Sequence, residues 1–129
     1  MKVYLAARYS SKAQMEVYAQ KLEKIGIEVT SRWLEEPHAS DAEISDDLKT
    51  QYALMDLEDV ERADVLIFFS VEPTTPTPRG GRHVEFGYAL ALGVHIIVVG
   101  PKENIFHHVP WVNFAKDFEE AKGLLLERP

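Results

Sequence analysis

Residues 63–90 read ADVLIFFSVEPTTPTPRGGRHVEFGYAL, and this stretch decides the fold class. Residues 63–70 form an almost unbroken apolar run, which predicts a strand buried on both faces. A connection rich in proline, threonine and glycine follows, and a helix then begins near Glu85 and ends at Gly93. A strand, a loop and a helix in this order are typical of an open α/β sheet, which binds its ligands at such loops.

The rest of the chain alternates in the same way. Strands are predicted at residues 2–7, 27–33, 94–99 and 112–114, and helices at residues 12–24, 41–62 and 117–127. Ser10 or Ser11 can cap the first of these helices, and Ser40 or Asp41 the second. We therefore predict a single-domain α/β fold over residues 1–129, Rossmann-like or flavodoxin-like, with helices on both faces of a parallel sheet. Right-handed crossovers give the strand order 2-1-3-4-5, with residues 27–33 at an edge.

Composition limits the classes of protein that remain. A chain of 129 residues suffices for one domain, and the absence of cysteine excludes disulfides, thiol catalysis and thiolate metal sites. No apolar run approaches the roughly 20 residues of a membrane span, and residues 1–7 are too short for a signal peptide, so we expect a soluble cytoplasmic protein. A net charge of -7 disfavours binding to nucleic acid polymers, so any phosphate should belong to a small ligand.

Glu85 stands out because it is the only charge in an otherwise apolar helix turn. Gly80, Gly81 and Gly87 allow the backbone to approach closely around it. Near the first turn of its helix, the positive end of the helix dipole would favour an ionised carboxylate, which is a competent nucleophile. The alternative is that Glu85 only accepts hydrogen bonds from backbone amides.

A second acid, Asp56, interrupts the apolar face of another predicted helix. It shares one i, i+4 stripe with Leu48, Tyr52 and Val60, whereas Asp59 lies off this stripe. The stripe should pack on the sheet close to the first acid. A buried acid that is bonded to a backbone amide or an arginine is the alternative.

Tyr4 lies in the middle of the first predicted strand and could donate a hydrogen bond that orients a carboxylate. A core tyrosine with a locally bonded hydroxyl is the alternative. Two acids in unequal environments within one cleft suit cleavage of a glycosidic bond, in which one acid attacks C1 of the sugar and another group protonates the leaving group. Glu85, Asp56 and Tyr4 are therefore the candidate catalytic residues.

Two loops should meet beside these residues, because the carboxyl ends of parallel strands share one edge of the sheet. The loops supply candidate substrate-binding residues, which are Arg8, Tyr9, Ser10, Arg79, Gly81 and Arg82. Arg79 and Arg82 flank two glycines ahead of a helix N-terminus, which predicts an anion site, with a solvated basic loop as the alternative. Tyr9 could stack on a base or simply pack within the protein.

Motifs for several other ligands are absent. The chain has no G-x-x-x-x-G-K-[ST], and no G-x-G-x-x-G follows the first strand, so ATP hydrolysis and hydride transfer are excluded. His107 and His108 form the only histidine cluster and have no carboxylate partner at ligand spacing. We therefore expect neither a metal ion nor a cofactor.

Three segments carry a family resemblance: VYLAA at 3–7, MDLEDVERADV at 55–65 and VEFGYALALG at 84–93. In pattern and order they resemble the nucleoside 2-deoxyribosyltransferase family, including its relatives that hydrolyse 2'-deoxynucleoside 5'-monophosphates. The resemblance implies that Glu85 forms a deoxyribosyl-enzyme intermediate, that Tyr4 orients it, and that Asp56 contacts or protonates the nucleobase. It also implies a homo-oligomer with shared active sites, in which a neighbour supplies the region around Asn113.

The chain departs from the transferases in the loop before Glu85. Transferases carry an acid there that meets the sugar's 5'-hydroxyl, whereas this chain has Arg79, which suits a 5'-phosphate. The substrate is therefore expected to be a deoxynucleoside or deoxynucleotide together with a free nucleobase or water, and transfer and hydrolysis both stay open. A non-catalytic nucleotide-binding or sensor module on the same fold is the rival hypothesis, and a flavodoxin-like interaction domain is a third.

Overall fold

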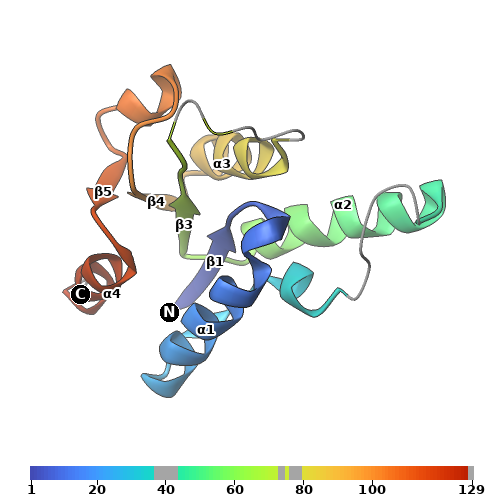
Figure 1. Ribbon diagram of the computed structural model, residues 1–129, viewed down its shortest axis with the longest axis horizontal. Coiled ribbons are helices and arrows are strands. Elements are labelled where there is room, and N and C mark those ends of the chain that lie inside the picture. The colour runs from blue at the N-terminus through green and yellow to red at the C-terminus, as the bar shows by residue number, and fades with distance from the viewer. Residues whose placement is uncertain (37–43, 73–74, 76–79, 128–129) are drawn as a thin grey trace.

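The computed structural model describes residues 1–36, 44–72, 75 and 80–127. A five-stranded parallel sheet runs through its centre in the order β2-β1-β3-β4-β5, so the predicted α/β fold and strand order are confirmed. Figure 1 shows the central strands β1, β3 and β4 between the helices. The strands are β1 (Lys2–Ala6), β2 (Glu28–Val29), β3 (Val65–Phe69), β4 (His95–Val99) and β5 (Asn113–Ala115).

Four α-helices cover the two faces of the sheet (Figure 1). They are α1 (Lys12–Lys24), α2 (Asp46–Glu61), α3 (Gly81–Leu92) and α4 (Phe118–Leu126), with short 3-10 turns at η1 (Tyr9–Ser11), η2 (Arg32–Glu35) and η4 (Ile105–His108). On one face α1 packs against α4, where the rings of Tyr18 and Phe118 stack with centroids 4.0 Å apart. On the other face α2 lies against α3, and the Tyr88 hydroxyl donates to Glu61.

The strand predicted at residues 27–33 is shorter in the structure. Only Glu28–Val29 pairs with β1, and the chain then turns into η2. Side chains end the ladder: the Ser31 hydroxyl accepts the amide of Leu5 at 2.7 Å, and the carboxylate of Asp59 accepts the amide of Arg32 at 2.9 Å. The prediction that this strand lies at an edge is confirmed.

Side-chain caps mark the start of α2 and α4 but not of α1. The α1 helix has the predicted bounds, although Ser11 occupies the N-cap position without a side-chain hydrogen bond. The proposed caps Ser40 and Asp41 lie outside the described residues; α2 instead begins at Asp46, where the Ser45 hydroxyl accepts the amide of Leu48 at 3.1 Å. None of the helices in the described ranges combines the length and apolarity that a membrane span requires.

Candidate active site

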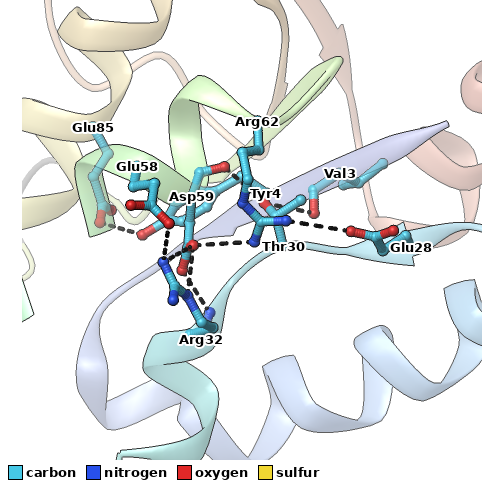
Figure 2. Close-up of polar contacts among 9 residues, drawn as sticks. All are labelled: Val3, Tyr4, Glu28, Thr30, Arg32, Glu58, Asp59, Arg62 and Glu85. Carbon is cyan, nitrogen blue, oxygen red and sulfur yellow. Dashed lines mark hydrogen bonds and ion pairs between the residues drawn. The ribbon is translucent and has the colours of Figure 1, made fainter. Parts of the chain in front are cut away.

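The side chains of Tyr4 and Glu85 meet in the centre of the molecule (Figure 2). Tyr4 belongs to β1 and is completely buried, and its hydroxyl donates a hydrogen bond to Oε2 of Glu85 on α3. The sheet places them together because Tyr4 projects from the central strands toward the face that α3 covers. A tyrosine hydroxyl therefore holds the one carboxylate that interrupts the apolar helix.

Burial dominates the electrostatics of Glu85. It raises the pKa of this carboxyl from 4.5 to about 8; the Tyr4 hydrogen bond lowers the pKa, and the nearby charge of Asp56 raises it. The effect of the helix dipole is strongest in the first helical turn. Because α3 begins at Gly81, Glu85 lies beyond that turn. The prediction that the helix dipole keeps Glu85 ionised is therefore wrong for the unliganded site.

Asp56 belongs to the same charged cluster. Burial, and then the charges of Glu36 and Asp59, raise the pKa of Asp56 from 3.8 to about 7, while Arg32 lowers it. Its Oδ1 atom is buried and has no hydrogen-bond partner within the described part of the chain. The alternative of a satisfied structural acid does not fit this oxygen.

Asp59 is a third buried acid, which the stripe analysis wrongly placed away from the core. Its carboxylate accepts hydrogen bonds from Nε of Arg32 at 2.8 Å and from Nη2 of Arg62 at 3.2 Å (Figure 2). Its backbone carbonyl accepts the hydroxyl of Thr30 at 2.9 Å. Asp59 is thus a paired structural acid one helical turn from Asp56, and Arg62, three residues further along the chain, was the available sequence signal.

Glu36 is the second acid that the sequence analysis missed. It is buried at the end of η2, and burial raises the pKa of its carboxyl. Its backbone carbonyl accepts hydrogen bonds from Nζ of Lys12 at 2.5 Å and from the Tyr9 hydroxyl at 3.2 Å. No sequence pattern identified Glu36 as a buried acid, because the adjacent Glu35 and Glu36 resemble two ordinary glutamates exposed to solvent.

A cleft of about 550 Å³ opens at the carboxyl edge of the sheet, and Tyr4, Asp56 and Glu85 are not among the described residues that line it. Ala7, Arg8, Ser10 and Ser11 line one side, and Phe69, Ser70 and Val71 line the other. Two of the predicted binding residues, Arg8 and Ser10, therefore face it, and the Nε atom of Arg8 is buried without a partner among the described residues. Tyr9 lies instead beside Trp33, with ring centroids 6.2 Å apart.

No family model matches the sequence, and no curated protein matches it. Among solved structures, the CMP N-glycosidase BcmB of Clostridium botulinum is 26% identical, with a TM-score of 0.62 over 98% of this chain and 99% of the other. A 2-deoxyribosyltransferase from Bacillus psychrosaccharolyticus is 19% identical, with a TM-score of 0.70 over 95% and 90% of the two chains. These neighbours match the nucleoside 2-deoxyribosyltransferase family.

The resemblance found in the sequence is thus confirmed at low sequence identity. A conserved protein of Enterococcus faecalis V583 shares the fold of this chain, with 16% identity and a TM-score of 0.64 over 96% and 98% of the two chains. The BcmB chain is matched over nearly its whole length.

The structure gives Arg82 a partner other than a ligand. Its side chain is buried, and both terminal nitrogens contact the carboxylate of Glu103. Arg79, the other arginine of the predicted anion site, lies outside the described residues. Gly81 is exposed at the start of α3, and a Cβ atom placed there would have no neighbour within 4 Å.

Asn113 is not part of the cluster around Glu85 in its own chain. It begins β5, which β3 and β4 separate from β1, and its side chain contacts His95 at 2.8 Å. The described ranges contain no group of three or more histidine, aspartate and glutamate side chains that could hold a metal ion.

Proposed function

We propose that the protein cleaves the N-glycosidic bond of a 2'-deoxyribonucleoside or its 5'-monophosphate. The observation that carries this proposal is the partly buried contact between the Tyr4 hydroxyl and the Glu85 carboxylate, with Asp56 in the same charged cluster. The CMP N-glycosidase neighbour supports this class of reaction by its name. The 2-deoxyribosyltransferase neighbour supports the fold.

In the proposed reaction the carboxylate of Glu85 attacks C1' of the sugar, and the bond between C1' and the base breaks. Asp56 donates its proton to the departing base, a role suited to an acid whose pKa is raised to about 7. Positive charge develops on the sugar in the transition state, which stabilises ionised Glu85 and offsets its burial. Water or a second base then attacks C1', the Asp56 carboxylate takes up the proton that this group loses, and the bond between C1' and Glu85 breaks. The Tyr4 hydroxyl orients the Glu85 carboxylate throughout.

Two observations favour a 5'-monophosphate. Arg8 lines the cleft and carries a buried nitrogen without a partner in the described ranges, so an anionic oxygen there would satisfy it. The CMP N-glycosidase neighbour is named for a nucleoside 5'-monophosphate. Since CMP is a ribonucleotide, both ribose and deoxyribose substrates belong in the test.

The test compares wild type with Glu85→Ala on each nucleoside and each 5'-monophosphate, with and without a second free base. We expect the substitution to lower turnover by at least about 10³-fold, because it removes the attacking group. Chromatography of released base and new nucleoside separates hydrolysis from transfer. Glu119→Gln on the exposed face of α4 is the control and should behave as wild type.

A second measurement follows the covalent intermediate itself. Intact mass of acid-quenched wild type should show an adduct of one sugar, which Glu85→Ala should lack. Full turnover by Glu85→Ala would refute the proposal. Binding without turnover by wild type on every substrate would support a nucleotide-binding module instead.

We further propose that the protein forms a homo-oligomer with shared active sites. Large apolar side chains are exposed on several elements, including Leu54 on α2, Val84 on α3 and Trp111 before β5. An exposed tryptophan such as Trp111 is a typical anchor of protein interfaces. Asn113, which is remote from Glu85 in its own chain, would then contribute to the site of a neighbour.

A further inference from the structure

Glu103, between β4 and η4, joins two other segments at the carboxyl edge of the sheet. Its Oε1 atom accepts Nη2 of Arg82 at 2.7 Å, and its Oε2 atom accepts Nη1 of the same residue. Oε2 also accepts the backbone amide of Val71, after β3, at 3.2 Å. The two charged side chains are almost completely buried, at 2% and 9% exposure.

Both partners of this ion pair are held by the core. The guanidinium of Arg82 lies over the ring of Phe68, 5.0 Å from its centroid. The backbone amide of Glu103 donates to Nδ1 of His107 at 3.0 Å, and His107 is completely buried against Phe68 and Phe86. The pair therefore has a fixed location relative to β3.

The ion pair between Arg82 and Glu103 lies at the start of α3, which has no side-chain N-cap. Gly80 occupies the N-cap position of α3 and offers no side-chain hydrogen bond. Arg82 lies in the first turn, three residues before Glu85, so fixing Arg82 fixes the rotation and height of the turn that carries Glu85. A buried ion pair adds little net stability compared with apolar side chains of similar volume, because removing two charges from water is costly. Its bidentate geometry defines an orientation instead.

We propose that Arg82 and Glu103 are positioning residues, which set the first turn of α3 so that the Glu85 carboxylate meets the Tyr4 hydroxyl. This inference rests on the proposed function and extends it, because it assigns Arg82 to the support of the nucleophile rather than to the substrate. The pair does not touch the reacting atoms and acts through Glu85. Its loss should therefore lower kcat while KM stays nearly unchanged.

The experiment uses Glu103→Gln and the apolar double variant Arg82→Met/Glu103→Met. We expect each to lower kcat by about 100-fold, the effect of displacing a reacting group by roughly 1 Å. The single variant leaves a buried guanidinium without its partner and could fail to fold, whereas the double variant removes both charges and should unfold at a denaturant midpoint close to that of wild type. The matched control is Tyr88→Phe, which removes a contact of α3 with α2 one helical turn after Glu85 and should retain kcat.

The outcomes separate this inference from the proposed function. A folded double variant with the kcat of wild type would overturn the positioning role, while inactivity of Glu85→Ala would still support Glu85 as the nucleophile. Full turnover by Glu85→Ala would instead overturn the proposed function and this inference with it. A folded double variant with a low kcat and an unchanged KM supports positioning, since a purely structural pair would be replaced without loss of turnover.

Discussion

Glu85 combines two demands on a single side chain, because it must lie away from water and still carry a charge when it reacts. Burial raises its pKa from 4.5 to about 8. Between these two pH values the folded protein holds a proton on Glu85 more tightly than the unfolded chain does. The free energy of unfolding therefore falls as the pH rises through this window, and the loss is complete above about pH 8.

Glu85→Gln should accordingly be more stable than wild type at about pH 8, and the two should be nearly equal near pH 4. The gain is on the order of a few kcal/mol, because each pKa unit corresponds to about 1.4 kcal/mol. Denaturant unfolding at several pH values measures it. Equal stability of the two proteins at pH 8 would show that burial does not raise the pKa of Glu85. Glu119→Gln, at an exposed position, should show no gain that grows with pH.

Tyr4→Phe removes the hydrogen bond that lowers the pKa of Glu85. The pKa of Glu85 should therefore rise further, and the part of the pH profile of kcat/KM that needs ionised Glu85 should move to higher pH. At neutral pH we expect kcat to fall by about 10- to 100-fold, since hydrogen bonds to charged groups contribute roughly 1.5–3 kcal/mol. Steady-state kinetics across pH check this, with Tyr88→Phe as the control. An unchanged pH profile would remove Tyr4 from the proposed mechanism.

Among the helices and strands, the sequence predicts best those whose pattern of apolar residues reflects burial in the core. The bounds of α1 match the prediction, and β3 and β4 lie within the predicted runs. The strand predicted at residues 27–33 fails because alternation along the chain carries no information about the distant side chains of η2 and α2 that end the ladder. Pairing with Asp59 is a tertiary contact, and it overrides local strand propensity.

The same distinction separates the predicted site residues from those that were missed. Glu85, Asp56 and Tyr4 are polar groups in apolar patterns, so sequence alone marks them. Glu36 and Glu103 lie in segments that already look polar, and only the fold shows that they are buried. Charge in an apolar context is therefore visible in the sequence, while burial of a charge in a polar context is not.

The closing helix offers a test of local stability that is independent of the site. The carboxylate of Asp117, the N-cap residue, accepts the amide of Glu120 at 2.9 Å, and the Glu120 carboxylate accepts the amide of Lys116, the residue before the cap, at 3.2 Å. Asp117→Ala should lower the free energy of unfolding by about 1 kcal/mol. Asp117→Asn keeps an acceptor oxygen and should lose much less. Denaturant unfolding compares them, and equal losses would mean that the cap contributes nothing.

At the scale of the whole molecule, the proposed assembly predicts that the protein sediments as a species larger than a monomer. Trp111→Ala should shift it toward monomer, because a large aromatic side chain at an interface often contributes most of the binding energy. If neighbours share the active site, activity should fall with the same concentration dependence as assembly. Analytical ultracentrifugation and activity on a dilution series check both, with Glu119→Gln as the control. A wild type that stays monomeric while fully active would contradict the shared site.

The ring stack between Tyr18 and Phe118 also has a consequence for how the chain is made. It joins α1, which leaves the ribosome early, to α4, which leaves late, and Tyr18 also lies against Phe69 at the end of β3. Until α4 emerges, this apolar face of the nascent chain has no cover and is open to water, to chaperones and to other nascent chains. Emergence of α4, rather than early collapse of the first strands, is therefore the step at which this face becomes protected.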